Sequence, residues 1–427
     1  MKQEANWGYA LAVLCSVWSG AAVAQLQGTV VETSGRGANT GVLERARPEY
    51  DSPGLYTGAF LVQPEIEVET GYTDNAYLTR DNKVSDGFVY VNPKMRINST
   101  WSRHALAAEL GVGLKRYLRE TVRDEEDYSA LVRGRYDMGG EATLTGAGRF
   151  VRRYESQYNI YTVDNAASTI PVNDIGGTLV AAAKRGRFRF SLSGIVGRLD
   201  YSDYTTIDGD RVSQESRDRS SYAGAAQVDY EISPSAAAFV QVGYEQLDYD
   251  DGVEQGIQNR NSKAYRIMGG TSFDLSKLMR GRIGAGYIRR KYDGSVFDPV
   301  SGFTVEGKIE YFPSQLTTFT LDVHRVVEDS TVSDLGGFFR TGGDIRVDHE
   351  LLRNLLLNAT GSFEYGEYQE RRSKVHIWQV GAGASYLANR HISADFGVNY
   401  GERDSNDLTL GDDFKEFRLN FAVHYRI

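Results

Sequence analysis

The segment Lys415–Ile427, KEFRLNFAVHYRI, alternates between apolar and polar side chains at almost every position. Its apolar positions are Phe417, Leu419, Phe421, Val423, Tyr425 and Ile427. Successive side chains of a strand point to opposite faces, so this segment has one apolar face and one polar face. Such a final strand, with aromatic rings on its apolar face, is typical of barrels that have lipid outside and water inside. We therefore expect these six residues to belong to the strand that closes a membrane barrel.

The composition agrees with many strands that are apolar on one face only. The 427 residues include 27 Tyr and 46 Gly, and the mean hydropathy is only −0.42. After the N-terminal leader, no apolar run approaches the ~20 residues that a membrane helix needs. The net charge of −9 and the lack of a basic stripe argue against nucleic acid as a partner.

The N-terminus predicts a secretory signal peptide over residues 1–24. Lys2 supplies the positive charge, Ala10–Val17 form a short apolar core, and Ala22-Val23-Ala24 is a small-x-small cleavage site. The only cysteine, Cys15, lies in this leader, so a lipoprotein remains an alternative there, although Leu14 is bulky for that signal. The mature chain is then expected to contain no cysteine and no disulfide. Residues 25–58 are polar and rich in turn residues, and predict an N-terminal arm on the periplasmic side.

Residues 59–427 predict the barrel, because the two-residue period persists from Phe60 to the end. The connections alternate between short and long. The short turns are centred near Ser102, Gly139, Gly186, Pro234, Lys277, Pro313, Arg353 and Asn389. The long polar loops are centred near Asp81, Arg123, Ala166, Gly209, Asn259, Phe297, Ser333, Glu370 and Asn406. This alternation predicts about eighteen antiparallel strands, with short periplasmic turns and long extracellular loops.

A soluble all-β protein, such as a propeller or a long sandwich, is the structural alternative. Strands of soluble proteins average about five or six residues. Several runs here exceed ten residues and carry many charges on their polar face. We therefore predict an all-β transmembrane antiparallel barrel in the outer membrane, because only a closed sheet satisfies its backbone in hydrocarbon.

The polar faces of the predicted strands carry charges of both signs, which suits a water-filled bore. A Lys or Arg facing lipid at the membrane midplane costs ~2–4 kcal/mol. Most of these charges are expected to form cross-strand pairs. The acidic candidates for the lumen lining are Glu65, Glu67, Glu69, Glu306 and Glu310. The basic candidates, which also form a possible guide for anions, are Arg133, Arg135, Arg149, Arg187 and Arg189.

Little in the chain points to catalysis. His324 shares a strand face with Asp322, but no nucleophile accompanies this pair. No H-E-x-x-H zinc spacing occurs. The acidic loop Asp248–Gly252 departs from the helix-loop-helix calcium pattern and predicts a solvated loop. We expect no enzyme activity, no cofactor and no metal.

A set of motifs lies just before and within the start of the predicted barrel: Arg45-Ala46-Arg47-Pro48-Glu49-Tyr50-Asp51, Gly54, Gly58-Ala59-Phe60, Pro64 and Gly71-Tyr72-Thr73-Asp74-Asn75. In these residues the chain resembles the putative beta-barrel porin 2 family. Thr73 departs from the pattern, because an acidic residue is common there. The match covers about the first fifth of the mature chain, and the rest agrees in architecture alone.

The resemblance implies an outer-membrane barrel that is often encoded with exopolysaccharide or capsule machinery. It implies export of such a polymer, with a periplasmic polysaccharide-export protein as a possible partner. A passive porin for small solutes and a plugged structural or adhesin barrel remain alternatives. The other expected partners are outer-membrane lipid and the barrel assembly machinery.

Overall fold

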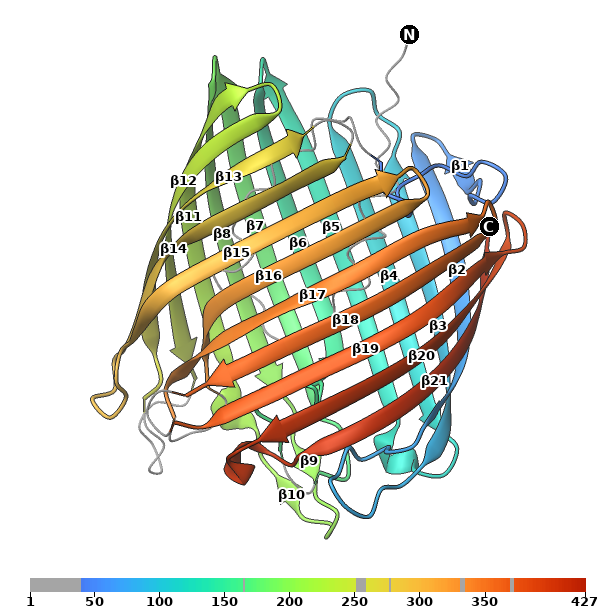
Figure 1. Cartoon of the computed structure of the whole chain (residues 1–427), viewed down its shortest axis with the longest axis vertical. Coiled ribbons are helices and arrows are strands. Elements are labelled where there is room, and N and C mark those ends of the chain that lie inside the picture. Colours follow the sequence, from blue (N-terminus) through green and yellow to red (C-terminus); the bar gives the residue numbers. More distant parts are fainter. Residues whose placement is uncertain (1–39, 164–165, 251–258, 276–277, 331–334, 369–371) are drawn as a thin grey trace.

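Antiparallel strands form a closed barrel in this protein. The computed structural model describes residues 40–163, 166–250, 259–275, 278–330, 335–368 and 372–427. Within them, eighteen long strands form one sheet, and each pairs with the next along the chain. The sheet closes because the first long strand also pairs with the last, from Glu65↔Arg426 to Thr73↔Arg418. The predicted all-β barrel of about eighteen strands is confirmed, and Figure 1 shows the tilt of its wall.

The eighteen wall strands contain 13 to 16 residues each. Their bounds are β2 (Phe60–Thr73), β3 (Asp86–Ser99), β4 (Ala105–Tyr117), β5 (Glu125–Gly139), β6 (Ala142–Tyr154), β7 (Pro171–Arg185), β8 (Phe188–Tyr201), β11 (Arg219–Ser233), β12 (Ala236–Tyr249), β13 (Ser262–Leu275), β14 (Met279–Tyr292), β15 (Val300–Ser314), β16 (Thr317–Asp329), β17 (Gly337–Leu352), β18 (Leu355–Glu367), β19 (Lys374–Leu387), β20 (Ile392–Ser405) and β21 (Phe414–Arg426). At ~3.3 Å per residue, thirteen residues span about 43 Å, which exceeds a hydrocarbon core of about 30 Å. The wall can therefore cross a bilayer with strongly tilted strands.

The short elements lie outside the wall. β1 (Leu55–Thr57) pairs with the start of β2, and β9 (Tyr204–Thr205) pairs with β10 (Arg211–Val212) in a long connection. Within the described residues, the single-turn 3-10 helices are η1 (Thr121–Arg123), η2 (Glu215–Arg217) and η4 (Leu408–Leu410). None of the helices in the described residues has the length and apolarity to cross a bilayer.

The outer face of the barrel is apolar. Large side chains that are 48–63% exposed cover it on every side. Examples are Leu179, Leu192, Val240, Ile267, Tyr287, Phe303, Ile345, Val380 and Phe421. Of the six apolar residues of the last strand, five are 38–48% exposed and Leu419 is half-buried on the same face. Contact between this large apolar surface and water is unfavourable, whereas lipid tails are as apolar as the surface itself.

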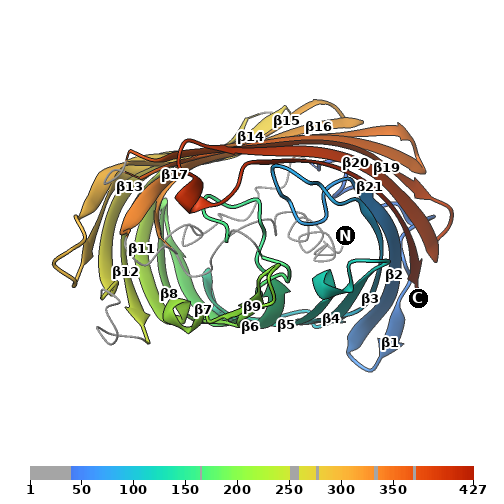
Figure 2. The same ribbon diagram turned by 90° about the horizontal axis from the view of Figure 1, so that it is seen from below.

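The connections alternate as the sequence predicts. In Figure 1 the short turns, β1 and the C-terminus lie at the top and upper right, and the long connections with β9 and β10 lie at the bottom and lower left. By the usual arrangement of outer-membrane barrels, the top is the periplasmic end. Seen end-on, the ring is flattened, and parts of the long connections lie within its outline (Figure 2).

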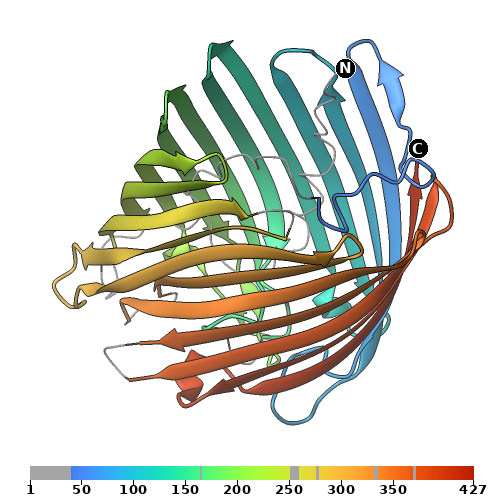
Figure 3. The ribbon, with the colours of Figure 1, turned by 45° about the horizontal axis from the view of Figure 1, so that its top comes forward.

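The predicted signal peptide and the first part of the predicted arm lie outside the described residues. The described part of the arm begins at residue 40, and residues 41–51 run across the inner side of the periplasmic end before the chain reaches β1 (Figure 3).

Candidate functional site

Ion pairs cover much of the inner wall. Arg266 of β13 binds Glu306 of β15 across the inner face of β14, and Lys94 binds Glu67 at 2.9 Å. His424 lies between Asp395 and Glu65, at 2.7 and 3.1 Å. Such pairs keep charge on the inner face while cancelling most of its net effect.

The β6–β7 connection crosses the lumen near its extracellular end. It leaves the wall after Tyr154, yet Ile160 packs against Gly366 of β18, which lies eight strands away around the ring. Ile160 is 1% exposed and belongs to an apolar cluster with Leu335, Phe338, Tyr368, Val375, Ile377 and Leu410. The connection therefore links two nearly opposite walls.

One buried arginine fastens this crossing. Arg403 of β20 is 1% exposed, and its guanidinium donates five hydrogen bonds of 2.7–3.1 Å to backbone carbonyls. The acceptors are Asn159, Ile160, Leu410, Gly411 and Asp412. A guanidinium has five N–H donors, so Arg403 uses them all to join the β6–β7 and β20–β21 connections.

The end of the β16–β17 hairpin also folds into the lumen. Pairing of β15 with β16 stops at Val305↔Arg325, whereas β16 and β17 stay paired to Asp329↔Gly337. Beyond that point both faces of the hairpin are buried. Phe339 packs on the inner wall against Ala264, Ile288 and Val300, and Phe338 packs against Tyr368 with ring centres 4.7 Å apart. We call the β6–β7 connection and this hairpin end the constriction.

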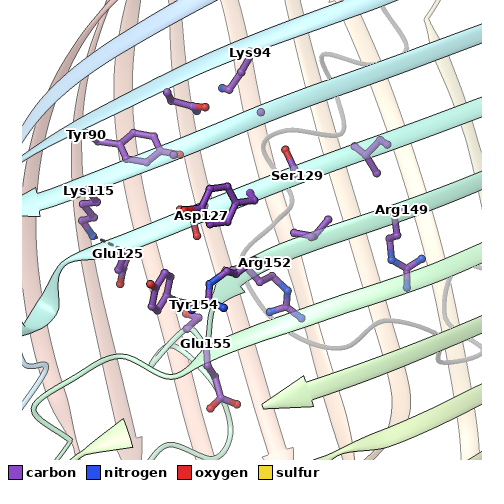
Figure 4. Close-up of a pocket in the computed structure, with 18 of the residues that line it drawn as sticks. Tyr90, Lys94, Lys115, Glu125, Asp127, Ser129, Arg149, Arg152, Tyr154 and Glu155 are labelled. Atoms are coloured by element: carbon purple, nitrogen blue, oxygen red, sulfur yellow. Dashed lines mark ion pairs between the residues drawn. The ribbon is translucent and has the colours of Figure 1, made fainter. Parts of the chain in front are cut away.

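The constriction leaves a cavity of about 700 Å³ beside it. The inner faces of β3 to β7 and the first residues of the β6–β7 connection line this cavity, with Glu416 and Arg418 of β21 (Figure 4). Eight basic residues line it: Lys94, Lys115, Arg123, Arg133, Arg149, Arg152, Arg153 and Arg418. Five acidic residues line it: Glu109, Glu125, Asp127, Glu155 and Glu416. The lining is therefore net basic.

A family profile that matches the sequence identifies the family of this chain. The profile of the family described as "Putative beta-barrel porin 2" matches residues 47–426, nearly the whole chain. The chain belongs to this porin family. No curated protein matches it.

Solved outer-membrane proteins of Pseudomonas aeruginosa are similar to this porin at low identity. OccK2 (OpdF) is 12% identical, with a TM-score of 0.45, and covers 86% of this chain and 98% of its own. The outer membrane protein OpdK is 11% identical, with a TM-score of 0.44 and the same coverages. OpdL is 11% identical, with a TM-score of 0.43, and covers 87% of this chain and 99% of its own.

The five arginines predicted to line the lumen differ in position, and only some of them line the cavity of this porin. Arg133 and Arg149 line the cavity, whereas Arg135, Arg187 and Arg189 do not. Arg135 binds Asp137 at 3.1 Å, and Arg189 faces Asp229 in the strand register. Four further arginines, which were not among the candidates, line the cavity: Arg123, Arg152, Arg153 and Arg418. The adjacent Arg152-Arg153 pair ends a predicted strand, and Arg418 lies on the polar face of the final predicted strand, so the sequence did carry a local signal for these three.

The predicted acidic candidates lie on the inner side of β2 and β15. Glu65 contacts Arg96, His424 and Arg426. Glu306 binds Arg266 and Glu310 binds Arg280, the latter at 2.5 Å. Glu69 has no ion pair among the described residues. None of these five lines the cavity.

His324 and a cluster of three aspartates each have a charged neighbour in the structure. His324 lies 3.1 Å from Glu364, which is a lumen-facing contact. Asp200, Asp218 and Asp250 come together at the extracellular rim, and burial together with these neighbours raises the pKa of Asp218 to about 6. Arg198 already binds Asp200 and Asp250, at 2.8 and 2.6 Å, so a cation is in place there. Asp251 and Gly252 of the acidic loop lie outside the described residues.

The described part of the predicted arm sits on the inner wall at the periplasmic end. The N–H of Val42 donates to Thr318 at 2.9 Å, and Arg280 binds Glu44 at 2.7 Å. Arg47, which is 4% exposed, binds Glu350 at 2.7 Å. These contacts fix residues 41–51 against β14 to β17, so the segment narrows the periplasmic mouth of this porin.

Proposed function

We propose that this porin is a water-filled pore through which polar solutes, and anions above all, cross the outer membrane. The observation that carries this proposal is the cavity beside the constriction, with its eight basic and five acidic residues. A barrel of eighteen strands is too wide for wall side chains to fill, so the constriction sets the path. In a narrow path with low-dielectric walls, excess positive charge concentrates anions.

Ion selectivity tests this proposal. In planar bilayers under a KCl gradient, we expect the wild-type channel to prefer chloride. Arg133→Glu with Arg149→Glu should lower the chloride-to-potassium permeability ratio at least about three-fold, because it changes the lining by four charges. Arg133→Glu with Arg153→Glu tests the same point while keeping the ion pair between Arg149 and Asp174.

The matched control places the same charge change outside the cavity. Arg116→Glu with Arg211→Glu alters two exposed arginines that do not line it. This control should leave the permeability ratio unchanged. Equal ratios in the wild type and in both cavity variants would contradict the proposal.

The second candidate function is export of an acidic polysaccharide, which the resemblance in the N-terminal part of the barrel implies. The aromatic residues Tyr90, Tyr154 and Tyr158 beside the arginines favour it, because sugar rings pack on aromatic faces. In this proposal a periplasmic polysaccharide-export protein docks near residues 41–51, at the periplasmic mouth.

A gene deletion tests the export role. Cells that lack this porin should accumulate the polymer in the periplasm and lose it from the surface. Normal surface polymer in the deletion strain, measured by extraction and by antibody labelling, would contradict export and leave the solute pore as the function.

A further inference from the structure

The cavity contains basic residues beyond those that its acidic residues neutralise. Within the described chain, four of the eight have ion-pair partners: Lys94 with Glu67, Lys115 with Glu125, Arg149 with Asp174 and Arg418 with Glu416. Two of the acidic lining residues are bound by arginines from outside the cavity, Glu109 by Arg96 and Glu155 by Arg217. Among the acidic lining residues, Asp127 is the one without an ion pair in the described chain, so Arg123, Arg133, Arg152 and Arg153 leave the lining with excess positive charge.

Three of the arginines that line the cavity, Arg133, Arg149 and Arg153, share the inner face of two adjacent strands. Arg133 is opposite Ala147 and Arg149 is opposite Leu131, so the two arginines are diagonal neighbours on β5 and β6. Such neighbours have Cα atoms about 7–8 Å apart. Arg153 follows Arg149 on the same face of β6 after two strand periods, with Val151 between them. Asp174, opposite Val151 on β7, lies between Arg149 and Arg153 in the strand register and offsets one of the three positive charges. The remaining like charges repel one another unless a further anion lies near them.

The site is built around Arg149. A Cβ at Gly176 would lie 2.7 Å from Cζ of Arg149, so a side chain there would displace this guanidinium from its place over β7. Nε of Arg149 donates to Asp174 at 3.1 Å, while its Nη2 is buried and has no hydrogen-bond partner. Arg133 and Arg153 have no hydrogen bond or ion pair among the described residues, and Arg133 is exposed to the lumen. The wall thus presents guanidinium donors with unused capacity.

We propose that Arg133, Arg149 and Arg153 form a binding subsite for a carboxylate- or sulfate-bearing solute. Guanidinium groups bind carboxylates and sulfates by paired, charge-assisted hydrogen bonds. The cavity volume of about 700 Å³ is in the range of ligand pockets and admits an acidic sugar or a short acidic oligosaccharide. This inference deepens the proposed anion pore, on which it rests for its biological role.

Binding to the purified barrel in neutral detergent tests the subsite directly. The probe is trigalacturonate, measured by titration calorimetry, with the neutral maltotriose as a comparison. We expect trigalacturonate to bind and maltotriose to bind at least ten-fold more weakly. Arg133→Gln with Arg153→Gln should weaken trigalacturonate binding at least ten-fold, and neither change leaves a buried acid without its partner.

The control is Lys184→Gln, which removes an inner-wall charge that binds Glu231 outside the cavity. It should bind trigalacturonate as the wild type does. Equal binding by the double variant and the wild type, or no binding by the wild type, would overturn the subsite.

Measuring channel conductance together with trigalacturonate binding distinguishes the anion pore from the binding subsite. A channel that conducts chloride but does not bind trigalacturonate refutes the subsite and leaves the pore. A protein that binds trigalacturonate but does not conduct refutes the pore and leaves the subsite.

Discussion

Replacing Arg403 by alanine is expected to release the constriction and to raise the mean single-channel conductance at least about two-fold, with frequent fluctuations. Arg403 binds five carbonyl oxygens in two connections that meet inside the lumen. A hydrogen bond to a charged group contributes about 1.5–3 kcal/mol, and removing the donor leaves buried acceptors unsatisfied. The loss is local, because the strand pairing of the barrel does not depend on this side chain.

Two matched variants make this prediction specific. Arg403→Lys keeps the charge but has three donors in place of five, so it should restore the wild-type conductance only in part. Arg211→Ala removes an arginine that is 80% exposed and binds Asp203 on the surface, and should leave the conductance unchanged. A wild-type conductance trace for Arg403→Ala, in a barrel that still shows heat-modifiable migration on a gel, would refute the role given to Arg403.

Replacing Arg290 by methionine should destabilise the barrel by about 3–5 kcal/mol. Arg290 and Glu245 are 0% and 1% exposed on the inner wall, with Nη2 2.5 Å from Oε2. Removal of one partner of a buried pair leaves an uncompensated charge, which is the source of this cost. The free energy of unfolding can be measured by urea titration of the barrel folded into lipid vesicles.

The double variant is the decisive comparison. Arg290→Met with Glu245→Met removes both charges and should recover most of the lost stability. The exposed pair Arg116 and Glu126, at 45% and 48% exposure, provides the control, and Arg116→Met should change stability by no more than about 1 kcal/mol. An Arg290→Met variant as stable as Arg116→Met would show that the buried pair is unimportant for stability.

The wall of this porin is largely predictable from its sequence. An outer face in lipid and an inner face in water impose a two-residue period, and KEFRLNFAVHYRI shows that period without help from distant residues. The connections near Gly139 and Pro234 fall where turn residues interrupt the period. The strand number follows from counting such interruptions.

The constriction is less predictable, because it depends on contacts between residues far apart in the chain. Arg403 binds carbonyl groups, which carry no sequence signal. The hairpin end does leave a trace: Val326-Val327 and Phe338-Phe339 are adjacent apolar pairs that break the two-residue period. Such pairs indicate burial on both faces. The division of the arginine group could not be predicted, since it depends on which arginines find acidic partners across strands.

The crossing by the β6–β7 connection sets a limit on the cross-section of the ring. A circular ring of eighteen strands tilted by about 40–45° would have a diameter of about 36–39 Å. From Tyr154 to Ile160 the backbone reaches at most about 21 Å. Ile160 nevertheless contacts Gly366, which is almost diametrically opposite in strand order, so the long sides of the ring must approach one another there (Figure 2). The connection therefore acts as a tether across the short axis, and the barrel cannot become round while Ile160 stays seated.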